Sequence, residues 1–220
     1  TTGTTTIGAT TQNTGTVIVN SGVSAVVDNV QGAIAVTGGT TVSVTTTTGS
    51  TVNKDYTQSA VTVTGTNSSN TGDVNTTDVT VIQQAAATKS ATVVGKINGV
   101  VTIADANAAS LTAAGTITTV SLTNYANSTI DSGALAAVSL SGTAGTLGIT
   151  AGALTTATVN TLGINAVGLS GTNAITVDAD YTTLNIDNST TASTIANITA
   201  TGATTVNVSG DKLLTLTDNT

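Results

Sequence analysis

A short pattern of alternating aliphatic and polar residues recurs along this chain, and each copy is followed by a turn. It reads TTVSVT at residues 40–45, AAVSLSG at residues 136–142 and TTVNVSG at residues 204–210, with looser versions between these copies. Alternation over about four to eight residues is typical of a half-buried β-strand. Because the copies resemble one another, each is expected to be one unit of a repeat array that buries its apolar face against its neighbours.

The spacing of these strand patterns favours one fold class. Successive patterns are separated by 18 to 22 residues, measured at Val44, Val63, Val81, Ile103, Leu122, Leu140, Val159 and Val177. A sandwich or barrel also has short, evenly spaced strands, so strand spacing alone does not decide between the folds. The repeated pattern favours an all-β parallel β-helix, or β-solenoid, with coils of about 18–22 residues. About eleven such coils, with neighbouring strands about 4.8 Å apart, would form a rod about 50 Å long.

Composition agrees with a narrow aliphatic core. The chain has 39% hydrophobic residues but no Trp, Phe, Met, Cys, Pro or His. Its abundant Thr, Val and Ile suit a pleated sheet, whereas disorder is opposed by the small share of charged residues, 7%. The Ala-rich segments 83–90 and 104–114 are expected to be loops. We therefore expect residues 1–220 to be a single repeat array from a longer chain, with 1–30 as its N-terminal edge and 31–220 as its coils.

The charge balance limits the partners that the chain can bind. Its acidic residues are all Asp, eleven in number, and only four Lys oppose them, which gives a net charge of −7. Nucleic acid is not expected as a partner, because phosphate binding needs clustered basic residues, commonly with stacking aromatic rings. Membrane insertion is not expected either, because no apolar run approaches the roughly 18 residues of a membrane-spanning helix.

The residue inventory also argues against catalysis. Without His, Cys or Glu, the chain has no Ser-His-Asp triad, no Cys-His pair and no Glu-based acid and base. Two carboxylates can hydrolyse a glycoside, and a polysaccharide-active enzyme would use the pair Asp178 and Asp180. No basic or aromatic residues cluster around this pair, so we do not expect an enzyme.

Calcium is the more plausible ligand, because it prefers carboxylate and carbonyl oxygens. Asp178, Asp180 and Asp187 flank one strand pattern, and Asp131 and Asp105 end two others. These five residues are the candidate metal ligands. The calcium-binding nonapeptide of RTX solenoids is absent, so the alternative that each Asp only caps a turn stays open.

Several ordered segments resemble the self-assembling region of RTX-type surface-layer proteins of Gram-negative bacteria. They are GAIAVTGGTTVSVTTTTG at residues 32–49, AAATKSATVVGKINGVVTIADANAAS at 85–110, STIDSGALAAVSLSGTAGTLGI at 128–149, and TTLNIDNSTTASTIANITATGATTVNVSGDKLLTLT at 182–217. The resemblance implies a β-solenoid exported by type I secretion to the bacterial cell surface. It also implies a calcium-dependent two-dimensional lattice of copies, attached to lipopolysaccharide through a region outside this chain.

The leading hypothesis is therefore a structural protein, the lattice-forming segment of a secreted surface layer whose copies are bridged by calcium. The alternative is the stalk or repeat region of a large adhesin or biofilm matrix protein. A polysaccharide-active β-helix enzyme is the least favoured of the three.

Overall fold

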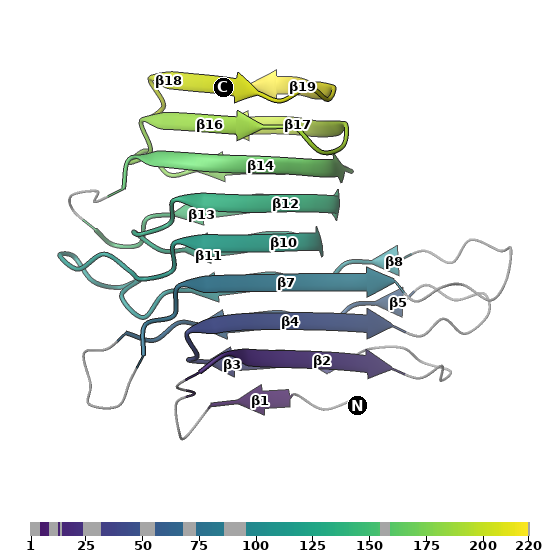
Figure 1. The fold of residues 1–220 in the computed structure, drawn as a ribbon, viewed down its shortest axis with the longest axis vertical. Coiled ribbons are helices and arrows are strands. Elements are labelled where there is room, and N and C mark those ends of the chain that lie inside the picture. Colours follow the sequence, from purple (N-terminus) through teal and green to yellow (C-terminus); the bar gives the residue numbers. More distant parts are fainter. Residues whose placement is uncertain are drawn as a thin grey trace, which may run out of the picture.

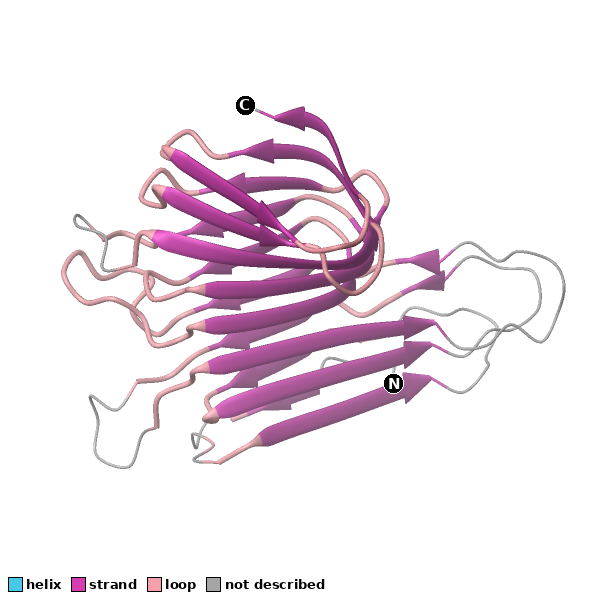
Figure 2. Cartoon of the chain, turned by 45° about the horizontal axis from the view of Figure 1, so that its top comes forward, coloured by secondary structure: helices cyan, strands magenta, loops and turns pink. Residues whose placement is uncertain are grey.

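The computed structural model describes residues 5–8, 13, 15–23, 32–48, 56–67, 74–85, 96–154 and 159–219. In these residues all regular secondary structure is β-strand, as Figure 2 shows. All strand pairs in the two large sheets are parallel. The prediction of an all-β parallel solenoid is confirmed. No helix in the described segments has the length and apolar character to cross a membrane.

The chain alternates between two stacked sheets, so that each turn of the solenoid adds one strand to each sheet (Figure 1). The nine-stranded sheet contains, in spatial order, β1 (Thr5–Ile7), β3 (Ile34–Thr37), β6 (Val61–Thr64), β9 (Val101–Ala104), β11 (Ser128–Asp131), β13 (Leu147–Thr150), β15 (Ala174–Val177), β17 (Ser193–Thr199) and β19 (Leu214–Asn219). The eight-stranded sheet contains β2 (Val17–Val23), β4 (Thr41–Thr48), β7 (Asp78–Ala85), β10 (Thr119–Tyr125), β12 (Ala137–Ala144), β14 (Thr161–Ser170), β16 (Thr183–Asp187) and β18 (Thr205–Ser209). A short parallel pair, β5 (Tyr56–Thr57) and β8 (Lys96–Ile97), lies beside them.

The core is a set of aliphatic columns between the two sheets. Strand alternation sends every second side chain inward, and the parallel register places equivalent residues of successive coils directly above one another. One column crosses all eight strands of its sheet and consists of Val17, Val42, Val79, Val120, Val138, Ile164, Ile186 and Val208. All members but the last are buried. Short aliphatic side chains fill most of this interior, but the core is not wholly aliphatic as the composition predicted, because the rings of Tyr125 and Tyr181 are also buried in it.

Coil length varies along the rod. The predicted length is found where Val138 follows Val120 after 18 residues and where Val208 follows Ile186 after 22. Between β4 and β7, however, the paired residues Val42 and Val79 are 37 positions apart. In this part of the chain, an interval of 18 to 22 residues leads from a strand of one sheet to the next strand, which belongs to the other sheet, as from Val63 in β6 to Val81 in β7. Two such intervals therefore make one coil. The described strands therefore make fewer coils than the eleven expected.

A stack of bulges interrupts the eight-stranded sheet at equivalent places in three coils. Register shifts occur between Thr123 and Tyr125 and between Ser141 and Thr143. Asn124 and Gly142 have φ values of 55° and 73°, and Gly168 of the next strand has 62°. Positive φ is tolerated by Gly and, among the other residues, most readily by Asn and Asp. The Asn124 Oδ1 atom also accepts a hydrogen bond from the Thr143 N–H group at 3.0 Å, which fixes one bulge to the next.

The first Ala-rich segment differs from its predicted loop structure. Its first three residues, from Gln83 to Ala85, belong to β7, and 86–90 lie outside the described residues. Gln83 can occupy an inward strand position because its side-chain amide is hydrogen-bonded to backbone groups of a neighbouring segment. The second segment, after Ala104, is the expected loop.

Candidate functional site

Three of the five candidate aspartates lie at the carboxyl ends of strands in the nine-stranded sheet. Asp131 is the last residue of β11, and Asp105 and Asp178 directly follow β9 and β15. Parallel strands all end at the same edge, so these residues follow one another along one side of the rod. The Asp105 N–H group donates to the Asp131 carbonyl at 2.8 Å, which makes these two direct neighbours.

Asp105 anchors the loop that follows it. Its Oδ2 atom accepts hydrogen bonds from the N–H groups of Thr116 at 2.6 Å and Ile117 at 2.7 Å, and from the Ser132 hydroxyl at 3.1 Å. Its Oδ1 atom accepts one from the Asn107 N–H group at 3.2 Å. A buried carboxylate with donors on both oxygens can close a loop of this length without an ion. The geometry favours the turn-capping interpretation for this residue.

Asp178 and Asp180 share one turn. The Asp178 Oδ2 atom accepts from the Ala151 N–H group at 3.1 Å, and its Oδ1 atom accepts from the Asp180 N–H group at 3.0 Å. The next residue, Tyr181, is buried and donates its hydroxyl to the Leu135 carbonyl at 2.9 Å. Burial raises the pKa of Tyr181, and the two nearby carboxylates raise it further. Asp178 is therefore a second turn-closing carboxylate.

Asp187 lies apart from this pair, although the three are close in sequence. It ends β16, whereas Asp178 and Asp180 precede that strand. The strand Thr183–Asp187 has five residues, and the four steps along it span roughly 13 Å. The Asp187 Oδ1 atom accepts from the hydroxyls of Ser209 and Ser189, both at 2.8 Å, and these bonds lower the pKa of Asp187.

Asp131 offers the clearest free oxygen. Its Oδ1 atom is buried and has no hydrogen-bond partner in the structure. The Ala108 carbonyl oxygen lies nearby, because both atoms would be within 3.2 Å of a Cβ placed on Gly152. An orphaned carboxylate oxygen beside a carbonyl oxygen fits part of a calcium shell, which needs six to eight oxygens. Among the residues described, no group of three or more carboxylates could hold a metal ion, so waters or a second molecule would have to complete the shell.

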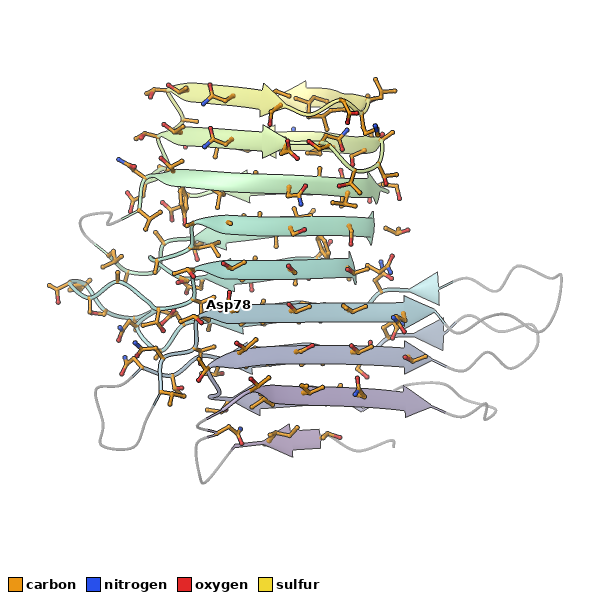
Figure 3. The ribbon with its side chains drawn as sticks, in the orientation of Figure 1. Asp78 is labelled. Carbon is orange, nitrogen blue, oxygen red and sulfur yellow. The ribbon has the colours of Figure 1, made fainter. Side chains whose placement is uncertain are left out.

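Another carboxylate was missed by the sequence reasoning, and it lies at this same edge of the stack, where strands of the nine-stranded sheet end and strands of the eight-stranded sheet begin (Figure 1 and Figure 3). Asp78 begins β7 and is labelled in Figure 3. Its register places it between Thr41 and Thr119 of the adjacent strands. The Thr77 hydroxyl donates to its Oδ2 atom at 2.6 Å. The signal available in the sequence was the acidic residue that opens the pattern DVTVI, because the copies TTVSVT, AAVSLSG and TTVNVSG have Thr or Ala before their first Val.

The C-terminal end of the solenoid leaves its core uncovered. Val206 and Val208 occupy inward positions of β18 but are 54% and 57% exposed, whereas their partners in β16, Leu184 and Ile186, are buried. A hollow of about 360 Å³ opens here, and Leu216 of β19 forms part of its wall. Among the described strands, β18 and β19 are the last of their sheets at this end (Figure 1).

Comparison with known proteins adds no family assignment. No protein-family model matches the chain, and a search of curated proteins found no significant match.

Proposed function

We propose that this chain is a structural segment of a secreted bacterial surface layer. The observation that carries the proposal is the pair of continuous parallel sheets, which makes the solenoid a stiff rod with regularly spaced surface groups. Rods of this kind suit a spacer or lattice element, because each coil is held by the coils on either side. The resemblance of the coil segments to surface-layer sequences supplies the biological setting, at the bacterial cell surface outside the cell.

The partner in this proposal is another copy of the same chain. A net charge of −7 makes copies repel one another at low ionic strength. Divalent cations at shared carboxylates would reverse that repulsion, and calcium is the ion that best matches oxygen ligands. Asp131 is the strongest described candidate because one of its oxygens lacks a donor. Asp180, at a partly exposed turn, is the second.

Electron microscopy of the purified chain, with calcium and after chelation, tests the proposal. Ordered sheets that form with calcium and dissolve on chelation would support it. The variant Asp131→Asn should then need more calcium for assembly. Asp218→Asn, which removes the same charge from an exposed position of β19, serves as the matched control and should behave as wild type.

Isolated rods that ignore calcium would contradict the ion-bridged lattice. Binding of such rods to a glycan or host surface, without self-assembly, would instead favour the adhesin or matrix stalk. Both functions use the same rod, so assembly is the property that separates them.

A further inference from the structure

The side chain of Gln83 pairs with the backbone of Gly99 as a neighbouring strand would. The Gly99 N–H group donates to the Gln83 Oε1 atom at 2.7 Å, and the Gln83 Nε2 atom donates to the Gly99 carbonyl at 3.1 Å. Both residues are buried. Gly99 follows Asn98, and these two residues form the only Asn-Gly dipeptide in the sequence.

The position of residue 99 accepts only glycine. A Cβ atom there would overlap the backbone carbonyl oxygen of Ser59. The Gly99 carbonyl also accepts a hydrogen bond from the Ala126 N–H group at 3.0 Å, so this residue is held by two segments of the chain. Close packing of backbone against backbone thus requires the glycine that makes the dipeptide chemically labile.

Asn98 itself is fixed through one end of its amide. Its Nδ2 atom donates to the carbonyl of Thr143 in β12 at 2.7 Å. Its Oδ1 atom is buried and has no partner in the structure. The folded state therefore uses the Nδ2 atom of Asn98 as a donor, and it provides no donor either to the Oδ1 atom or to the second carboxylate oxygen that an aspartate would have at this position.

We propose that Asn98 is a deamidation site whose reaction is slowed in the folded chain by the hydrogen bonds between Gln83 and Gly99. In the reaction, hydroxide removes the proton of the Gly99 N–H group, and that nitrogen attacks the Asn98 Cγ atom. A bond forms between the Gly99 nitrogen and the Asn98 Cγ atom, the bond from Cγ to Nδ2 breaks, and the departing nitrogen takes a proton from water and leaves as ammonia. The product is a cyclic succinimide. Water then opens the ring to aspartate or isoaspartate. Asn is among the thermolabile residues of proteins, and a following Gly offers the least steric hindrance to the attack.

The hydrogen bonds of the folded chain oppose each requirement of this reaction. Gln83 holds the proton that must leave, and its second bond fixes the peptide that must rotate. Deamidation then needs a local opening of the coil, whose frequency depends on local stability. The product does not return to the same place, because an acid at position 98 loses the donor to Thr143 and puts charge on an oxygen without a donor. Deamidation during a local opening is irreversible, so the amount of aspartate and isoaspartate at position 98 increases with the number of times that this coil has opened.

Peptide mass mapping of the full chain, incubated at mildly alkaline pH, measures the rate of aspartate and isoaspartate formation at position 98. The folded protein should react about a hundredfold more slowly than the chain in urea. Gln83→Leu should raise the folded rate about tenfold or more, since it removes both bonds to Gly99. The matched control is Gln84→Leu, which changes the exposed neighbouring residue and should leave the rate unchanged.

Equal rates in the folded and urea-unfolded chains would overturn the proposal. A folded Gln83→Leu protein with the wild-type rate would also overturn it. If that variant does not fold, hydrogen exchange of the wild-type Gly99 amide replaces it as the test. Strong protection of that amide is expected, by a factor similar to the slowing of deamidation, and rapid exchange would refute the role of Gln83.

Discussion

Shortening a side chain at either of two positions in the aliphatic column tests directly whether burial between the two sheets stabilises the fold. Val120 and Val208 belong to the same column and can undergo the same change, Val→Ala, but Val120 is fully buried and Val208 is 57% exposed. At Val120 the change removes about two methylene equivalents from the core, worth about 1.6 kcal/mol of transfer free energy. The unfilled volume adds about 1 kcal/mol. The free energy of unfolding should therefore fall by about 2.5 kcal/mol.

At Val208 the same change should cost about 0.7 kcal/mol, because less than half of the side chain is buried and no closed cavity forms. Urea unfolding followed by far-ultraviolet circular dichroism measures both values. The midpoint should shift by about 1 M for Val120→Ala and by about 0.3 M for Val208→Ala. Equal shifts in the two variants would refute the reasoning, since they would mean that burial between coils does not set the stability.

The other predictions concern buried polar groups and bulges. Tyr181→Phe should destabilise by about 1 kcal/mol in urea unfolding because it removes the donor to a buried carbonyl, whereas Tyr125→Phe should stabilise slightly, because the Tyr125 hydroxyl is buried and unpaired. Burial raises the pKa of both tyrosines, so the stability that their neutral forms contribute is complete below about pH 10 and is lost as the pH rises further. A wild-type urea midpoint that stays constant from pH 9 to about pH 11 would contradict this. Gly142→Ala should lower the free energy of unfolding by about 1–2 kcal/mol, because φ is 73° and the Cβ would meet the side chain of Asn124 in the preceding coil. Gly148→Ala, where φ is not positive and the Cβ would make an ordinary van der Waals contact with Thr129, should be neutral or stabilising. Asp105→Ala should cost about 2–4 kcal/mol because several donors lose their acceptor, and thermal unfolding of a fully stable variant would show that the loop closes without it.

The strand pattern predicted the elements better than it predicted their arrangement. Alternation around Val63 and Val81 correctly indicated strands, because a period of two is a local property. Their assignment to different sheets was not accessible, because it depends on the length and path of the connecting loops. The result was a correct fold class with an overestimated number of coils.

The candidate sites show the same division between local and long-range information. An Asp after a strand is a local signal, and it located the turns at Asp105 and Asp178 correctly. Whether such a carboxylate meets backbone donors or stays unpaired, as at Asp131, depends on residues from other coils. The pairing of Gln83 with Gly99 could not be predicted either. A Gln after a series of aliphatic residues suggests the end of a strand, not a side chain that replaces the hydrogen bonds of a neighbouring strand.

The hydrogen bonds between coils run along the rod, and this direction determines how the molecule would bear force. Under tension along the rod, the interfaces between coils are loaded in series, so the rod is no stronger than its weakest interface. In the eight-stranded sheet the β4–β7 interface pairs eight residues, whereas the β7–β10, β14–β16 and β16–β18 interfaces pair five each. Axial pulling would separate the coils at an interface with five pairs before it separates β4 from β7, while bending must strain both sheets at once. A sheet built from such rods would gain its tensile strength from sideways links between molecules rather than from the solenoids themselves.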